Sequence, residues 1–290
     1  LRLVQSWQDF QQTGISMKRL GDIFNTKPEP TLDPSKSRLP AIKGDVRFEN
    51  VRFRYSPDSP EVVRDVSFGI RPGSVIGVVG RSGSGKSTIS KLLQRLYVPE
   101  SGKILIDGVD IATTDPAWLR RQIGVVLQEN FLFNASIRDN IALGARGADD
   151  EAVWKAAAHA RIDDYIRSLP GGLDSLVGRD AHPSGGQAQR IAIARALLVD
   201  APVLVLDEAT AFTDPEAEAD IQQALSALVE GKTVLVIAHR MRTVENADRI
   251  VVLAGGRVVE EGSPAELRAK DGGIFRHMSE LQQQSAGWSI

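Results

Sequence analysis

The residues best suited to chemistry form a glycine-rich stretch at positions 80–88, which reads GRSGSGKST. This stretch fits the spacing G-x-x-x-x-G-K-[ST], in which glycines let the backbone fold around a phosphate group with its N–H groups turned inward. The apolar run 75–79 precedes it and a helical pattern follows, so a helix N-terminus would add its positive dipole end. We expect Lys86 to reach the outer phosphates of a nucleotide and Ser87 to bind Mg²⁺. An ordinary glycine-rich turn is the alternative, which the strand and helix on either side disfavour.

A pair of acidic residues, Asp207 and Glu208, ends the apolar run 203–206. A carboxylate at the tip of a buried strand can hold Mg²⁺, usually through water, and this is the role expected of Asp207. Glu208 follows immediately and should point in another direction, where a carboxylate could orient and deprotonate an attacking water. The alternative is that two acids simply end a strand, and the phosphate-binding pattern disfavours it.

A second glycine-containing motif, Ser184-Gly185-Gly186-Gln187, opens a helical run that continues to about residue 198. Ser184 at the N-cap and Gln187 three residues later have the spacing of a capping box. Each glycine in the first turn costs about 1 kcal/mol of helix stability relative to alanine, so a purely structural helix start would not need two of them. The pattern favours a phosphate group that approaches the backbone closely.

In this order, the motifs resemble those of the nucleotide-binding domain of ATP-binding cassette (ABC) transporters, from about residue 46 to residue 267. The resemblance implies that the nucleotide is ATP, that Mg²⁺ accompanies it, and that the chain hydrolyses it. Tyr55 stands where the family places an aromatic side chain that stacks on adenine. The ATP-binding residues implied in this way are Tyr55, Gly80, Ser82, Gly83, Ser84, Gly85, Lys86, Ser87, Thr88, Ser184, Gly185, Gly186, Gln187 and Asp214.

The resemblance also implies the catalytic residues. Glu208 matches the general base, Lys86 the lysine of the phosphate loop, and His239 the histidine that contacts the γ-phosphate. Gln128 matches the glutamine that senses Mg²⁺ and faces the membrane domain. Taken singly, Tyr55 could be an ordinary aromatic residue of a strand, and Gln128 and His239 could be surface residues at strand ends. Only the joint order of these residues favours the functional interpretation. The implied metal ligands are Ser87, Gln128 and Asp207.

The elements that must position these motifs can be predicted from hydrophobic patterns. The continuous apolar runs 75–79, 203–206 and 234–237 indicate parallel strands that are buried on both faces between helices. Alternating patterns at about 46–55 and 66–70 indicate antiparallel strands, and glycines between 251–253 and 258–259 indicate a hairpin. We predict an α/β fold with a P-loop NTPase (RecA-like) core and parallel sheet, a small antiparallel β subdomain at about 42–75 and an inserted helical subdomain at about 129–198.

The first 41 residues form a separate region in this interpretation. Residues 1–24 have a helical apolar pattern, and four prolines between 28 and 40 then indicate an extended linker. The helix could pack on the domain or arrive from a membrane domain that the chain lacks. We therefore predict a lead-in at 1–41 and the nucleotide-binding domain at 42–290. The first residue is Leu1, which is consistent with a piece of a longer protein.

The composition excludes several classes of protein. The 290 residues contain no cysteine, which excludes disulfides, zinc–thiolate sites and thiol catalysis. Lysine and arginine total 35 against 37 acidic residues, a net charge of −2, so the charge balance gives no reason to expect nucleic acid as a partner. No apolar run approaches the roughly 20 residues that a membrane helix needs.

Two features resemble a narrower group, the bacterial type I secretion exporters of the hemolysin-exporter kind. They are residues 7–12 with 19–22, and residues 115–122, where Asp115 and Pro116 also suit an N-cap and the first helical position. This resemblance implies export of a protein or peptide, at the cytoplasmic face of a bacterial inner membrane. The implied partners are a transmembrane domain and a second nucleotide-binding domain in a head-to-tail dimer with ATP.

Other functions stay open at this point. A transporter of small molecules such as siderophores or lipids has the same motifs. A soluble ABC ATPase that acts on DNA or ribosomes would be expected to carry coiled-coil or basic insertions, which are not evident. A regulatory domain that hydrolyses ATP only weakly is suggested by three departures from the family pattern: Pro183 in place of leucine, Arg179 in place of glutamate within 177–182, and Phe212-Thr213 beside Asp214. We expect hydrolysis to survive these departures and the coupling between domains to change.

Overall fold

The computed structural model describes residues 2–25, 29, 42–127, 130–145, 147–207, 215–238 and 240–286, without the side chains of 215–217 and 283–286. Contacts divide the chain into two units, Leu1–Arg38 and Leu39–Ile290. The first contains helix α1 (Arg2–Phe24), which has no buried residue. No helix in these ranges has the length and apolar content that crossing a bilayer requires.

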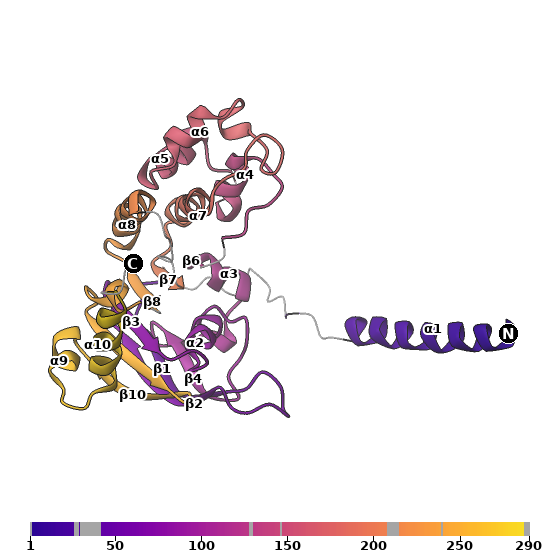
Figure 1. Cartoon of the computed structure of the whole chain (residues 1–290), viewed down its shortest axis with the longest axis horizontal. Coiled ribbons are helices and arrows are strands. Elements are labelled where there is room, and N and C mark those ends of the chain that lie inside the picture. Colours follow the sequence, from indigo (N-terminus) through magenta and orange to yellow (C-terminus); the bar gives the residue numbers. More distant parts are fainter. Residues whose placement is uncertain are drawn as a thin grey trace. The chain divides into compact units, whose positions relative to one another are not determined.

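A mostly parallel sheet forms the centre of the second unit (Figure 1). Its strand order within the described residues is β10-β9-β3-β8-β7-β6, and only the β9–β10 pair is antiparallel. The three apolar runs that predicted parallel strands are β3, β7 and β8. The strands are β3 (Val75–Gly80), β6 (Ile123–Val126), β7 (Val203–Asp207), β8 (Thr233–Ile237), β9 (Arg249–Ala254) and β10 (Arg257–Gly262).

Strand β7 shows why these strands are apolar on both faces. Val203 and Val205 join an apolar cluster shared with the antiparallel sheet, whereas Leu204 and Leu206 join a cluster on the helix-covered side. All four side chains are buried. Since neighbouring side chains of a strand point to opposite faces, burial of both faces requires the continuous apolar run that the sequence shows.

The antiparallel sheet has the order β2-β1-β4-β5. Phe48 and Phe68 stack in its core with ring centroids 4.6 Å apart. Its last two strands follow helix α2 in the chain, so the sheet extends beyond the predicted limits of about 42–75. The first half of β4 is exposed, which leaves little apolar pattern to detect. The elements are β1 (Val46–Phe53), β2 (Val63–Ile70), α2 (Lys86–Leu93), β4 (Ser101–Ile106) and β5 (Val109–Asp110).

Helices between β6 and β7 form a group of their own (Figure 1). They are α4 (Ile137–Ile141), α5 (Asp150–His159), α6 (Asp163–Ser168) and α7 (Gly185–Val199). The remaining helices are α3 (Pro116–Arg121), α8 (Pro215–Val229), α9 (Pro264–Ala269) and α10 (Ile274–Ala286), with short 3-10 helices at Ile111–Thr113, Ala142–Gly144, Gly172–Asp174 and Met241–Val244. The start of α3 is as predicted, because the Asp115 carboxylate accepts a hydrogen bond from Trp118 N at 2.6 Å and Pro116 follows it.

Glu260 of β10 attaches the C-terminal helix to the sheet. Glu260 is 7% exposed, and its carboxylate accepts hydrogen bonds from Ile274 N and Phe275 N, each at 3.0 Å, and forms an ion pair with Lys270 at 3.2 Å. Burial alone would raise the pKa of Glu260, but the two backbone N–H groups and Lys270 together lower it below its ordinary value. The charged form therefore stabilises the start of α10.

We predict that Glu260→Gln lowers the free energy of unfolding by about 2 kcal/mol at pH 7, because a neutral amide with one acceptor oxygen replaces a carboxylate bonded to two N–H groups. A lowered folded-state pKa stabilises the protein above the unfolded-state value of 4.5, and this contribution is lost as the pH falls through the folded-state pKa. Urea unfolding of both proteins at pH 7 and at acidic pH should show a difference that shrinks on acidification. An equal difference at both pH values would contradict the role of the charge.

Candidate functional site

The predicted phosphate loop joins the end of β3 to the start of α2. Gly80 lies so close to β9 that a Cβ atom there would be 2.3 Å from the carbonyl oxygen of Leu253. Gly85 caps α2 with a φ of 102°, which residues with side chains rarely adopt, and its carbonyl accepts a hydrogen bond from Thr88 N at 3.1 Å. Both ends of the loop therefore require glycine, and the loop leads directly into the positive end of a helix.

Lys86 directs its charge back into this loop. The residue is only 4% exposed, and its Nζ donates hydrogen bonds to the carbonyl oxygens of Gly80 at 2.9 Å and Arg81 at 3.1 Å. Ser82, Gly83 and Ser87 are exposed, whereas Ser84 is buried. The loop thus combines a concealed ammonium group with accessible backbone and hydroxyl groups, which suits a polyphosphate chain.

Tyr55 lies beside the same helix. Its hydroxyl is 2.9 Å from Oγ1 of Thr88, and the residue is 43% exposed, so part of the ring is accessible to a ligand. Tyr97 contacts it with ring centroids 5.1 Å apart. The sequence motifs did not identify Tyr97, and only its aromatic type could have drawn attention to it.

Asp207 lies at the same edge of the sheet as the loop. It pairs in register with Ile237 of β8, which in turn pairs with Val78 of β3. The carboxyl ends of β3 and β7 therefore point the same way, with β8 between them. Ser87 and Asp207 would supply a hydroxyl and a carboxylate, the oxygen donors that Mg²⁺ accepts. Among the described residues, no group of three His, Asp or Glu lies together in a way that could bind a metal ion.

The motif 184–187 forms the predicted capping box at the start of α7. Ser184 N donates to Oε1 of Gln187 at 2.8 Å, and Gln187 N donates to Oγ of Ser184 at 3.4 Å. Ser184 and Gly185 are exposed. Helix α7 packs against α4, α5, α8 and strand β6, whereas α2 packs against β3, β7 and β8, so the two loops begin helices that pack on different elements (Figure 1).

The structure thus brings Tyr55, Thr88 and Lys86 together around one helix. Four of the expected residues lie outside the described residues: Gln128, Glu208, Asp214 and His239. The departure Phe212-Thr213 lies outside them as well.

We predict that Gly85→Ala weakens ADP binding at least tenfold, because the left-handed backbone at the mouth of the loop would be strained, at a cost of about 1–3 kcal/mol. Gly73→Ala is the matched control, since Gly73 has a φ of 72° in a turn before β3 with no atom near its missing Cβ. Titration calorimetry with ADP and thermal unfolding would measure both effects. We expect both variants to lose stability, Gly85→Ala more because its added Cβ would lie 3.0 Å from the carbonyl oxygen of Val62, and only Gly85→Ala to bind ADP more weakly. Unchanged ADP binding in Gly85→Ala would contradict the prediction.

Comparisons with known proteins agree with this geometry. A family model described as ABC transporter matches residues 63–211, about half of the chain. The Toxin RTX-I translocation ATP-binding protein of Actinobacillus pleuropneumoniae is 51% identical over 285 residues, covering 98% of this chain and 40% of the relative. The Leukotoxin translocation ATP-binding protein of Mannheimia haemolytica is 53% identical over 283 residues, covering 97% of this chain and 40% of the relative.

A solved structure of a bacterial Atm1-family ABC exporter with ATP bound is also similar, with a TM-score of 0.83 and 40% sequence identity. The match covers 95% of this chain and 48% of that chain, so this chain spans less than half of each of these proteins. The predicted fold class is confirmed. The chain belongs to the ABC transporter family, whose nucleotide-binding domains hydrolyse ATP.

Proposed function

We propose that this chain binds and hydrolyses ATP with Mg²⁺ and that hydrolysis drives export of a protein or peptide across a bacterial membrane. The observation that carries the ATP site is the buried Lys86, whose Nζ lies against the carbonyls of the glycine loop. The proposal of protein export rests on similarity to toxin and leukotoxin translocation proteins over nearly the whole chain. A small-molecule transporter remains the alternative within the family.

Each part of the nucleotide has residues suited to it. Tyr55 stacks on the adenine, and the backbone N–H groups of residues 80–88 with Lys86 bind the phosphates. Ser87, Gln128 and Asp207 would hold Mg²⁺, Asp207 through water, and the ion would supply positive charge that stabilises the phosphates. Glu208 orients the attacking water and accepts its proton, while His239 contacts the γ-phosphate.

We further propose that two copies face head to tail, with each ATP between residues 80–88 of one chain and Ser184, Gly185, Gly186 and Gln187 of the other. The geometry of α7 supports this. The capping box engages the N–H groups of Ser184 and Gln187, and the N–H groups of Gly185 and Gly186 have no acceptor within their own helix. Gly185 is exposed and has no side chain, so its N–H group is accessible to a γ-phosphate. Asp214 would lie at the same dimer interface.

The remaining partners and the location follow from the same family. A transmembrane domain would receive the conformational change, and residues 1–41 would connect to it. The ATP-binding domain would then work at the cytoplasmic face of a bacterial inner membrane, without nucleic acid as a partner. ATP closes the dimer and hydrolysis releases it, which is a switch driven by contacts to the γ-phosphate.

We predict that Glu208→Gln abolishes ATP turnover and yields a stable ATP-bound dimer, because the general base is lost while the binding groups remain. Steady-state ATPase assays and size-exclusion chromatography with ATP and Mg²⁺ would measure both properties. Glu230→Gln is the matched control, since Glu230 is exposed just after α8. Normal turnover in Glu208→Gln would overturn the assignment of the base.

The departures near the motif 184–187 can be tested in the same assay. Arg179 is exposed and pairs with Asp180 at 3.0 Å, within a turn closed by hydrogen bonds from Asp180 N and Ala181 N to the Leu176 carbonyl. The hydrogen bond from Leu176 N, followed by Arg179, lowers the pKa of the Asp180 carboxyl. The turn is therefore closed by contacts among its own residues.

We predict that the unaltered chain hydrolyses ATP and that the double variant Arg179→Glu, Pro183→Leu changes turnover by less than about threefold, a difference below about 0.7 kcal/mol. The phosphate loop and Glu208 are the same in both proteins. An inert unaltered chain combined with an active double variant would instead indicate a regulatory domain that hydrolyses ATP only weakly.

A further inference from the structure

Three aromatic rings cluster where the proposed adenine-stacking residue emerges from the antiparallel sheet. The ring centroids of Phe53, Tyr55 and Tyr97 are 5.0 to 5.4 Å apart, and Tyr55 meets both neighbours edge to face, at 82° and 90°. Phe53 is 4% exposed, whereas Tyr55 and Tyr97 are 43% and 40% exposed. Phe53 is therefore a buried support, and the two tyrosines stand together at the surface. Edge-to-face contacts at this distance favour one ring orientation over others.

Side chains of helix α2 contact the hydroxyl group and the ring of Tyr55. The hydroxyl is 2.9 Å from Oγ1 of Thr88, and Nζ of Lys91 lies 5.6 Å from the ring centroid. Tyr97 follows α2 in the chain by four residues. The helix that follows the phosphate loop, together with the segment after that helix, therefore determines where the ring of Tyr55 lies.

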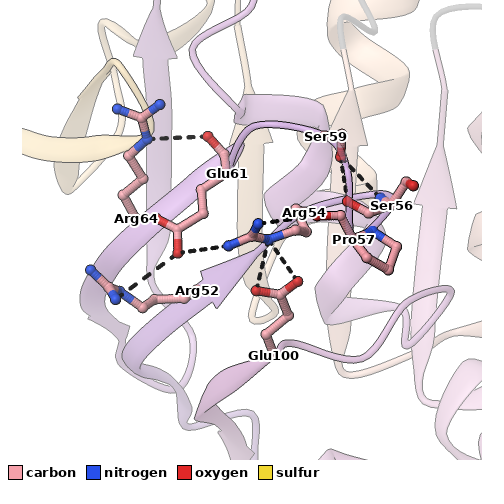
Figure 2. Close-up of polar contacts among 8 residues, drawn as sticks. All are labelled: Arg52, Arg54, Ser56, Pro57, Ser59, Glu61, Arg64 and Glu100. Atoms are coloured by element: carbon pink, nitrogen blue, oxygen red, sulfur yellow. Dashed lines mark hydrogen bonds and ion pairs between the residues drawn. The ribbon is translucent and has the colours of Figure 1, made fainter.

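The residue before Tyr55 is bound to the same segment, as Figure 2 shows. Nε of Arg54 lies 2.9 and 3.1 Å from the two carboxylate oxygens of Glu100, three residues after Tyr97. Arg54 also reaches Glu61 at 3.6 Å and the carbonyl of Pro57 at 3.3 Å. Each of these partly exposed contacts is weak alone, but together with the ring contact they fix two consecutive residues against residues 97–100.

We propose that Tyr97 is a positioning residue that orients Tyr55 for stacking on the nucleobase, with the Arg54–Glu100 ion pair as a brace. This inference rests on the proposed stacking role of Tyr55. Tyr97, Arg54 and Glu100 lie outside the phosphate loop. Their effect on nucleotide affinity is therefore confined to the contribution of the base. Loss of Tyr97 therefore raises KM for ATP and leaves kcat unchanged.

The first test compares a ligand that has a base with one that lacks it. In titration calorimetry, Tyr97→Leu weakens ADP binding about three- to tenfold, the equivalent of one aromatic contact, and leaves inorganic tripolyphosphate binding unchanged. Tyr97→Phe restores ADP binding because the ring contact remains. Val98→Ala is the matched control, since Val98 is the next residue, is 54% exposed and has no aromatic ring. Equal weakening of both ligands, or normal ADP binding in Tyr97→Leu, overturns the proposal.

A double-mutant cycle with Tyr55→Leu separates this inference from the function on which it rests. If Tyr97 acts through Tyr55, then Tyr97→Leu has no further effect on ADP binding once Tyr55 is replaced. Additive losses would show that Tyr97 acts independently and would overturn the positioning role alone. Normal ADP binding in Tyr55→Leu would overturn the stacking role of Tyr55, and the role of Tyr97 with it.

Discussion

The structure depends on the close approach of the backbones of β3 and β9 at the end of β3. An ammonium group is costly to bury unless oxygen atoms accept its hydrogen bonds, and the carbonyls of Gly80 and Arg81 do so for Lys86, a residue that is 4% exposed. Those carbonyls are in place because Gly80 lies against Leu253, at a distance that excludes any side chain. The pairing of β3 with β9 and the phosphate loop are thus parts of one constraint.

The sequence predicts most of the parallel sheet, because its strands carry a pattern that only burial on both faces explains. The alternation of β7 between two apolar clusters is the structural counterpart of the run 203–206. The capping box of Ser184 and Gln187 and the N-cap at Asp115 are predictable for a different reason, since each is formed by residues within four positions of one another.

What the sequence does not show are contacts between segments that are distant in the chain. Strand β4 joins the antiparallel sheet by pairing with β1, and its exposed first half gives no period that would reveal this. Tyr97 has no motif around it, and its significance appears only when the fold places its ring against Tyr55. The candidate site therefore contains two kinds of residue. Some belong to motifs that the sequence shows, and others, such as Tyr97, can be identified only from tertiary packing.

Helix α2 connects these two kinds of residue. Its first residue is Lys86, Thr88 contacts the hydroxyl of Tyr55, and Leu92 and Leu93 are fully buried in the cluster between the two sheets. A close-packed interior transmits displacement rather than absorbing it. Under the proposed function, α2 would therefore connect the groups that bind the phosphates with those that bind the base, whereas α7, which begins with the second motif, packs against α4, α5, α8 and β6. In the proposed head-to-tail dimer, a nucleotide bound to residues 80–88 of one chain would meet residues 184–187 of the other only when the two chains approach each other, and this is how such a site would couple nucleotide binding to motion.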